Sequence, residues 1–472
     1  MYRDLVWAFG LPIAGLLMMR FGFGFNGLYG QDGHIYYQFA SDLIEQFPHR
    51  PDSLNYSVPP FYPLLGSILG GIIRHVGLAM QLISTLALGG VMYITGLMIR
   101  RFGFMERKEV LPYLILTMIL SPYMFRGAMV VMTDMLTAFF SISTFWFYVL
   151  YREKESRKYW AGIVVMGLMA FFTRYAVAPL LILPCADALR ISLRRKSYGN
   201  VLIATGIMGV GLGFYFWLKG SETPEFVGHF LWDIWSPLNW FKSRFSGFDG
   251  ASDYTMINLI SVFYHFFHPA YFFLGIPLVV MSYRSVQKKK EYQVMLAAII
   301  LYSLFVAGLN FQNKRYLILS FPLVLILTAE GYQWFVRKIP AKWHIAIYGL
   351  LVVIQLGLCT YVFRSFYEYN QIEQRVAIMV KKQPPTTLYT FELNPSLESY
   401  GAEHQVINLY HEPITTFSQG ELLLVNPSKW EFQWKDRNPM INWVYAQENF
   451  EVELLGRDES GWELYRLGER KE

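Results

Sequence analysis

The chain has 472 residues, of which 54% are hydrophobic, 18% aromatic and only 16% charged, and its net charge is +6. A soluble protein of this length needs far more charged surface, so the composition excludes a soluble globular protein and predicts a polytopic membrane protein. The two cysteines, Cys185 and Cys359, both fall in apolar segments, which predicts no disulfide framework.

The charge is unevenly distributed along the chain. Residues 364–472 contain 11 Lys and Arg against 17 Asp and Glu, whereas the rest contains 30 against 18. An apolar basic part followed by a polar acidic part predicts a membrane domain at 1–363 and a soluble domain at 364–472. The basic excess is explained by orientation in a membrane, so no nucleic acid is expected as a partner.

Eleven segments are apolar over most of the roughly 20 residues that a helix needs to cross hydrocarbon. They lie near residues 5–25, 78–99, 110–125, 133–151, 159–173, 175–190, 200–218, 258–282, 293–310, 316–336 and 344–363. The first has no small-residue cleavage site after it, so we expect it to remain as a span. The predicted fold class is an all-α polytopic membrane domain with about 11 transmembrane helices. A small C-terminal α/β extracytoplasmic domain is expected to follow it.

The orientation of the chain in the membrane is tested by its clusters of Lys and Arg. They lie near residues 100–108, 152–158, 190–196, 284–290 and 337–342. With a cytoplasmic N-terminus, all of them lie inside if 59–74 does not cross the membrane. That segment is short and begins with two prolines, so we expect a re-entrant or surface-lying helix. The chain is then a multi-pass protein of the plasma (inner) membrane. Residues 29–57, 126–134, 173–175, 220–256, 310–316 and the C-terminal domain face outwards.

The first outer loop, 26–77, contains a predicted juxtamembrane helix. Apolar residues recur there at helical spacing from Tyr36 to Phe47, and His34 and Gln38 take the opposite side. This pattern is typical of a helix that lies along a membrane surface, here with Asp32 in its first turn.

Two further outer segments have distinctive compositions. Residues 220–256 mix Trp and Phe with Lys242 and Arg244, which suits the lipid headgroup layer and a cover over a lipid-linked substrate. The tail alternates strand-like runs at 387–391, 405–409, 421–425, 450–455 and 462–465 with helical runs at 394–400 and 428–447. A small α/β domain that serves as a lid or an acceptor-docking module is expected.

Charged and polar residues gather at the outer ends of the predicted spans. They are Asp32, His34, Arg126, Asp134, Arg174, Lys314 and Arg315. Because such groups are costly at membrane depth, they predict a functional cavity open to the outer leaflet. Arginines there can hold a phosphate, and a carboxylate can deprotonate an attacking hydroxyl. The sequence contains no Walker loop and no GxGxxG motif, so the donor need not be a nucleotide sugar.

Short motifs in these outer segments resemble those of a known superfamily. They are YGQDGHIYY at 29–37, PPFYP at 59–63, TDML at 133–136, TRY at 173–175, and NKRY at 313–316 followed by Pro322. In order and spacing they resemble the GT-C glycosyltransferases, most closely the protein O-mannosyltransferase and aminoarabinose-transferase type. The resemblance covers the whole membrane domain, although each motif is short.

The resemblance implies a polyprenyl-phosphate sugar donor, inversion at the anomeric carbon and a protein, lipid or glycan acceptor. It implies Asp32 as catalytic base, with Asp134 supporting it. Substrate-binding roles are expected for His34, Tyr36, Tyr37, Arg174, Tyr175, Lys314, Arg315 and Tyr316, with Arg315 near the donor phosphate. Gly33 stands where the family often has Glu, so a divalent metal is optional. Asp32 and Asp134 would be its ligands.

Each of these residues also has a purely structural interpretation. Asp32 and Asp134 are favoured types at the start of a helix and could act as caps. Arg174, Lys314 and Arg315 could anchor span ends by reaching to the interface, as such side chains commonly do. His265 and His268 share a helical face near an outer end, where an interfacial role is expected.

Two other functions remain open from the sequence. One is a multi-span transporter or flippase of a lipid-linked or anionic substrate. Repeated halves and helices broken at mid-membrane, which are common in transporters, are not evident in the sequence. The other is an assembly subunit with a decayed site, against which the intact Asp32, Asp134 and Arg315 argue.

Overall fold

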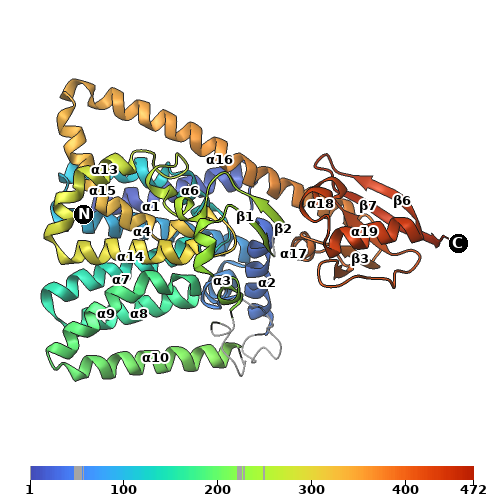
Figure 1. The fold of residues 1–472 in the computed structure, drawn as a ribbon, viewed down its shortest axis with the longest axis horizontal. Helices are drawn as coiled ribbons and strands as arrows, with labels where there is room; N and C mark the ends of the chain where they lie inside the picture. Colours follow the sequence, from blue (N-terminus) through green and yellow to red (C-terminus); the bar gives the residue numbers. More distant parts are fainter. Residues whose placement is uncertain are drawn as a thin grey trace. The chain divides into compact units, whose positions relative to one another are not determined.

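The computed structural model describes residues 2–46, 56, 58–219, 226, 229–247 and 250–471. The chain divides into two compact units, each of which is drawn from several segments (Figure 1). The first, helical unit comprises Met1–Gly27, Phe39–Ser243 and Thr255–Phe363. The second comprises Leu28–Gln38, Arg244–Tyr254 and Arg364–Glu472.

Long helices form most of the helical unit. They are α1 (Tyr2–Leu17, extended by a π-turn at Met18–Gly22), α3 (Phe61–Ile73), α4 (Val76–Phe102), α5 (Arg107–Leu114, extended by a π-turn at Ile115–Ile119), α6 (Pro122–Met129), α7 (Asp134–Lys154), α8 (Arg157–Thr173), α9 (Ala178–Arg194), α10 (Tyr198–Lys219), α13 (Gly275–Lys288), α14 (Lys290–Ala307) and α15 (Phe321–Lys338). Short turns α11 (Phe230–Asp233) and α12 (Asn258–Ser261) and several 3₁₀ turns connect them. Helices α2 (Gly30–Gln46) and α16 (His344–Lys381) contribute residues to both units.

Local sequence explains where these helices stop. The side chain of His75 caps α4 by accepting a hydrogen bond from the Leu78 N–H at 3.3 Å, and Gly103 ends the helix with a φ of +72°. Between them lie 27 mainly apolar residues. Other predicted spans are interrupted: the segment predicted at 110–125 bends by 72° between Ile119 and Pro122.

In the described part of the chain, six helices are long and apolar enough to cross a membrane, or seven if the bent pair α5–α6 is one span. The predicted count of about 11 is therefore not confirmed. The span predicted at 258–282 is wrong, because the chain there forms α12, a 3₁₀ turn and then α13. The predicted spans 133–151, 159–173 and 316–336 are the helices α7, α8 and α15. Of these, α8 has 17 residues and α15 has 18.

Helices α1 and α4 run antiparallel, as the contacts at their two ends show. At one end Arg100 Nη1 lies 2.8 Å from Asp4 Oδ2, and at the other Arg20 Nη1 donates to Gln81 Oε1 at 2.5 Å. The segment between these helices thus begins and ends on the same side of the bundle. Helix α3 packs against the start of α4, where the Tyr62 hydroxyl donates to the Met80 carbonyl at 3.0 Å. It has 13 residues, fewer than the roughly 20 that a span needs. That it does not cross the membrane stays a prediction.

The cationic clusters gather at the Asp4–Arg100 end of the bundle. Ion pairs join the helices there. Arg101–Glu153 joins α4 to α7, and Arg152 joins α7 to α9 through Asp187 and to α14 through Glu291. Arg337–Glu106 joins α15 to the start of α5. A single cationic end is the arrangement that the positive-inside rule predicts. That this end faces the cytoplasm stays a prediction.

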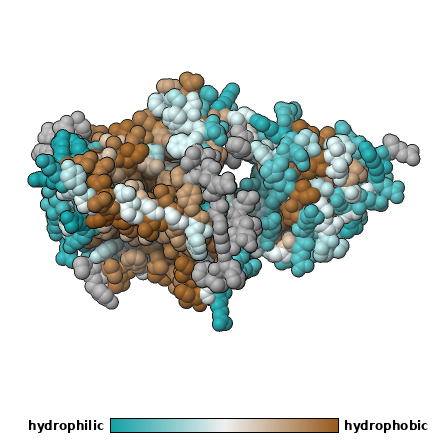
Figure 2. Space-filling view, turned by 90° about the horizontal axis from the view of Figure 1, so that it is seen from below, coloured by the Kyte–Doolittle hydropathy of each residue, from teal (hydrophilic) through white to brown (hydrophobic). Residues whose placement is uncertain are grey.

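The outside of the helical unit is hydrophobic. Figure 2 shows a broad apolar surface on this unit, and Leu202 and Val210 of α10 and Ile345 and Val353 of α16 are more than two-thirds exposed. Exposed apolar side chains over several long helices fit contact with lipid tails. With the spanning helices, they indicate a multi-pass membrane protein.

The second unit is built on a five-stranded sheet of order β4-β3-β5-β7-β6. Its strands are β3 (Thr387–Thr390), β4 (Gln405–Asn408), β5 (Leu422–Val425), β6 (Phe450–Arg457) and β7 (Glu463–Arg470). The pairs β3–β4 and β3–β5 are parallel, and β5–β7 and β6–β7 are antiparallel. Helices α17 (Asn394–Ser399), α18 (Pro427–Gln433) and α19 (Asn438–Asn449) and a hairpin of β1 (Arg244–Gly247) and β2 (Gly250–Asp253) complete the unit.

The core of this unit explains why all five predicted strands form. Leu388, Leu424 and Leu464 on three adjacent strands are fully buried together with Trp430 of α18. The predicted helix 428–447 is in fact two helices. Helix α18 ends at Gln433, and α19 begins at Asn438 with Pro439 in its first turn, where proline is favoured. The predicted boundary at 363 falls inside α16, which continues as helix to Lys381.

Candidate active site

The first residue of α7 is a buried carboxylate of the helical unit. Asp134 follows Thr133 at the start of the helix and is only 1% exposed. The positive end of the helix dipole favours a negative charge there. Burial of a carboxylate is costly unless the charge is paired, so its partners define the site.

The first partner is Arg174, in the short connection between α8 and α9. Its Nη1 lies 2.5 Å from Asp134 Oδ1, and its guanidinium lies over the Tyr316 ring at 4.3 Å from the centroid. Arg174 has extended backbone angles, which end α8 there. A 3₁₀ turn, Tyr175–Val177, follows immediately. Arg174 therefore lies in a very short connection between two helical segments, and its side chain points into the bundle.

The second partner is Arg315, in a 3₁₀ turn at Lys314–Ile318 that precedes α15. The Asn313 side chain caps this turn by accepting the Arg315 N–H at 3.1 Å. Arg315 Nε lies 3.3 Å from Asp134 Oδ2, and its Nη1 lies 2.9 Å from Met132 Sδ. We call Asp134, Arg174 and Arg315 the Asp134 cluster.

The Asp134 cluster has the chemistry of an anion site. It combines one carboxylate with two guanidinium groups, so it carries a net positive charge in a region shielded from water. Both arginines are about nine-tenths buried. A phosphate is attracted to such a site, because guanidinium groups donate pairs of hydrogen bonds to its oxygens.

The cluster lies at the end of the bundle opposite the cationic end. Helix α7 begins at Asp134 and ends with Arg152 and Lys154, and α15 begins after Arg315 and ends with Arg337 and Lys338. If the cationic end is cytoplasmic, the cluster faces the other side of the membrane.

Neighbouring aromatic residues enclose this end of the helical unit. The Tyr302 hydroxyl donates to the Tyr316 carbonyl at 2.9 Å, and the Tyr271 hydroxyl donates to the Lys314 carbonyl at 2.6 Å. Lys314 Nζ lies over the Tyr264 ring at 4.5 Å. These contacts fix the backbone of the turn that carries Arg315. Tyr302, Tyr264 and Tyr271 were not singled out from the sequence, because tyrosines in apolar spans are unremarkable there.

Tyr175 and Arg126 occupy separate positions near the same helix ends. Tyr175 is 7% exposed, and its ring packs edge-on against His229 at 5.6 Å between centroids. Arg126 is buried on α6, with its guanidinium 5.8 Å from the Tyr123 ring. Both predicted residues thus lie inside the helical unit rather than on its surface.

An apolar groove of about 440 Å³ runs between α8, α9 and α10. Its lining includes Phe171 and Ala178, which flank Arg174 along the chain, and continues to Trp160 and Met208. A groove of this shape and composition suits a hydrocarbon chain.

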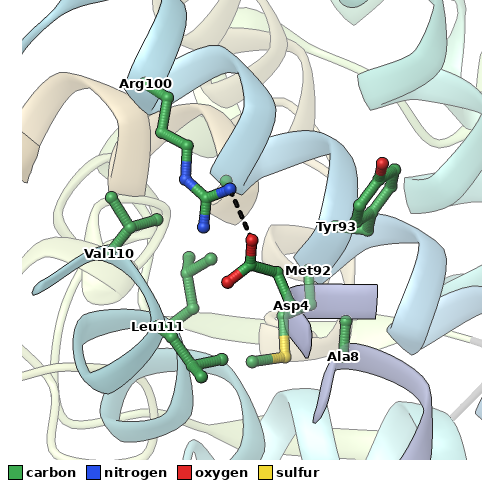
Figure 3. Close-up of a pocket in the computed structure, with 9 residues that line it drawn as sticks. Asp4, Ala8, Met92, Tyr93, Arg100, Val110 and Leu111 are labelled. Carbon is green, nitrogen blue, oxygen red and sulfur yellow. Dashed lines mark hydrogen bonds and ion pairs between the residues drawn. The ribbon is translucent and has the colours of Figure 1, made fainter. Parts of the chain in front are cut away.

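A second, smaller pocket lies at the cationic end. It is about 20 Å³ in volume, and Figure 3 shows the Asp4–Arg100 ion pair at it, together with Ala8 and Val110. This volume holds about one water molecule, so the pocket has no room for a sugar.

The remaining predicted residues lie on α2, in the second unit. Asp32, in the first turn, is partly exposed, as is Tyr37, whereas Tyr36 is 7% exposed. His34 is fully buried, with its Nε2 3.4 Å from Glu373 Oε2 and its ring 5.3 Å from that of Tyr400. Glu373 was not predicted from the sequence. Its helical spacing to Val376 and Val380 places a carboxylate on an apolar helix face, which could have marked it as a buried polar residue.

The residues of the Asp134 cluster do not fit a metal ligand set. Each oxygen of Asp134 already faces a guanidinium group. In the described part of the chain, no three His, Cys, Asp or Glu side chains come together as metal ligands would. A divalent ion therefore enters no step proposed below.

No protein-family model and no curated protein matches this sequence. Solved structures do match its fold. ArnT from Cupriavidus metallidurans bound to undecaprenyl phosphate aligns with a TM-score of 0.60 and 12% identity, over 98% of this chain and 97% of ArnT. The archaeal oligosaccharyltransferase AglB from Archaeoglobus fulgidus, in complex with an inhibitory peptide and a dolichol-phosphate, aligns with a TM-score of 0.57 and 11% identity. That match covers 99% of this chain and 74% of AglB. The chain therefore has the GT-C fold that its short motifs predicted.

Proposed function

We propose that this protein is a membrane glycosyltransferase. It moves a sugar from a polyprenyl-phosphate donor to an acceptor on the extracytoplasmic side. The observation that carries the proposal is the Asp134 cluster, in which a buried carboxylate holds two guanidinium groups at the end of the bundle opposite its cationic end. An anion site at that place suits the phosphate of a lipid-linked donor.

The ligands of two similar structures support a chemical class for the donor. ArnT binds undecaprenyl phosphate and AglB binds a dolichol-phosphate, and both ligands pair a phosphate with a long hydrocarbon chain. In this protein the apolar groove between α8, α9 and α10 would receive the chain. Arg174 and Arg315 would hold the phosphate, with Lys314, Tyr175 and Tyr316 around it.

In the proposed reaction the acceptor hydroxyl, or a similar nucleophile, attacks the anomeric carbon of the donor. Asp32 takes the proton from the nucleophile, a new bond forms to the anomeric carbon, and the bond from that carbon to the phosphate oxygen breaks with inversion. Polyprenyl phosphate leaves with the bonding electrons, and the two arginines stabilise its charge. Asp134 is proposed to orient the two arginines, and Tyr36 and Tyr37 to contact the sugar or the acceptor.

The test is donor turnover by purified protein in lipid vesicles, with a small panel of radiolabelled polyprenyl-phosphate sugars and an envelope extract as the source of acceptor. Released polyprenyl phosphate is measured for the wild type, Asp32→Asn and Glu45→Gln. Asp32 and Glu45 both lie on α2, and Glu45 is exposed, so the second variant controls for a lost charge on this helix.

We expect Asp32→Asn to lower turnover by roughly 100-fold or more, the usual contribution of a general base, with donor affinity retained. Glu45→Gln should match the wild type. Equal turnover by Asp32→Asn and the wild type would remove Asp32 as the base. Donor binding without turnover by any protein would favour the transporter or flippase instead.

A further inference from the structure

The start of α2, which carries Asp32, is packed into the second unit. Residues 28–38 belong to that unit together with 364–472. The Asn370 side chain, which is fully buried, donates to the Leu28 carbonyl at 2.6 Å. Tyr29 packs edge-on against Phe366 and Tyr369, at 5.1 and 5.4 Å between ring centroids. The backbone leading into α2 is therefore held by α16.

Glu373 contacts α2 on both sides of Asp32. Its Oε1 accepts a hydrogen bond from the Gly30 N–H at 3.2 Å, and its Oε2 lies 3.4 Å from His34 Nε2. Gly30 precedes Asp32 by two residues, and His34 follows it by two. One carboxylate thus contacts the first turn of the helix at both ends.

A second contact fixes the next turn of the helix. The Gln38 side chain donates to the Pro395 carbonyl at 2.9 Å and to Glu398 Oε2 at 3.1 Å. Pro395 and Glu398 belong to α17, so two different elements of the second unit hold successive turns of α2.

Burial of this pair is costly for stability. Glu373 is 1% exposed and His34 is fully buried. Burial raises the pKa of Glu373, and the His34 side chain and the Gly30 N–H only partly offset this effect. An apolar residue at such a position is commonly neutral or better for stability, so a buried polar pair is better explained by a need for one fixed arrangement.

We propose that Glu373 and His34 are positioning residues that fix the first turn of α2 and so orient the Asp32 carboxylate. This inference rests on the proposed function. It gives the C-terminal unit a part in the reaction: the unit holds the helix that carries the base, beyond the lid or docking role expected from its sequence. His34 then acts through the protein rather than as a ligand of the substrate.

The test compares Glu373→Ala with Glu373→Gln in the full-length protein. Alanine removes both contacts, whereas glutamine keeps an oxygen that can accept the Gly30 N–H. Asp458→Asn is the matched control. It breaks the ion pair between Asp458 and Arg375 of α16, which lies two residues from Glu373 along the helix, and it leaves the described contacts of α2 intact.

Two readouts are needed. The first is kcat and KM for the donor. We expect Glu373→Ala to lower kcat on the order of 10- to 100-fold, as misplacement of a catalytic group by about 1 Å does. The donor KM should stay within about threefold. Glu373→Gln should recover most of the loss, and Asp458→Asn should match the wild type.

The second readout is amide hydrogen exchange of residues 28–38, which needs no substrate. Exchange there should rise about tenfold or more in Glu373→Ala relative to Asp458→Asn, which measures the effect of a general loss of stability in the second unit, and it should stay near the wild-type rate in Glu373→Gln. If Glu373→Ala fails to fold, Glu373→Asp, which shortens the side chain by one methylene, should change both readouts in the same direction.

The proposal is overturned if exchange at 28–38 is unchanged in Glu373→Ala. It is also overturned if the wild type turns over donor and Glu373→Ala has the same kcat. Failure of the proposed function gives a different pattern. The wild type then turns over no donor, or Asp32→Asn stays fully active, and either result is independent of the amide exchange at 28–38.

Discussion

Asp134 links three elements of the helical unit through its two carboxylate oxygens. Arg174 comes from the end of α8 and Arg315 from the turn before α15. The sequence predicted each of these residues, because a charged side chain at the end of an apolar span is conspicuous. It could not predict that they meet, since the pairing depends on how α7, α8 and α15 pack.

This pairing makes Asp134 important for stability. We expect Asp134→Ala to lower the free energy of unfolding by about 3–5 kcal/mol, because it leaves two buried guanidinium groups without their counter-ion. Glu368→Gln, which breaks the exposed pair of Glu368 with Arg364, should leave the free energy of unfolding close to the wild-type value. Thermal unfolding in detergent compares the two variants. Equal effects would contradict the structural role of Asp134.

A second residue prediction concerns pH. Arg375 donates to both oxygens of Asp458, at 2.8 and 3.1 Å, and Ser460 adds further hydrogen bonds. The pKa of Asp458 is lowered from 3.8 to about 2, most strongly by the hydrogen bonds from Arg375 and further by those from Ser460. Because the folded pKa is lowered, the stabilisation is present above pH 3.8 and is lost as the pH falls towards 2.

The shift corresponds to roughly 1–2 kcal/mol after allowance for the half-exposed arginine. Asp458→Asn should therefore lose that stability at pH 6 and show a smaller further loss between pH 4 and 2 than the wild type. Amide exchange of β6 and β7 over this range measures the difference. Parallel pH profiles for the two proteins would contradict the assignment.

At the scale of elements, hydrophobic periodicity predicted the strands of the second unit well. The strands β3, β4 and β5 begin within one residue of their predicted starts, because each is a short run of buried apolar residues bounded by polar ones. Helix boundaries were less accurate. Composition alone could not show that 258–282 folds back into short turns, nor that α16 continues past the membrane segment into the second unit.

Close helix packing explains some of the glycines in the apolar helices. Gly331 of α15 lies against α13, where its N–H donates to Ser282 Oγ at 2.8 Å and an added Cβ would lie 2.2 Å from the Leu278 carbonyl oxygen. Gly349 of α16 has no atom within 4 Å of an added Cβ.

Gly331→Ala should therefore force α13 and α15 apart and cost about 1–3 kcal/mol. Gly349→Ala should be neutral or stabilising by up to about 1 kcal/mol, because alanine favours helix. Thermal unfolding of the two variants separates these effects. A Gly331→Ala protein as stable as the wild type would show that this helix contact is loose.

At the scale of the whole molecule, the sequence predicted a membrane protein with the GT-C fold, and the solved structures that match this chain confirm the fold. Its charge pattern also predicted the single cationic end of the bundle. The donor phosphate and the two arginines are proposed to act at the opposite end of the bundle, on the extracytoplasmic side. The sidedness of the reaction thus depends on both the orientation and the site.

Turnover by wild-type protein in sealed vesicles tests both together. Orientation is measured in a separate aliquot of each vesicle preparation, by whether a protease added outside removes the C-terminal unit. The radiolabelled polyprenyl-phosphate sugar is supplied to the untreated vesicles only in the outer leaflet, with acceptor outside. The account predicts release of polyprenyl phosphate from vesicles whose C-terminal unit faces out, and none from those with the opposite orientation. Release only from the opposite orientation, or from neither, would contradict it.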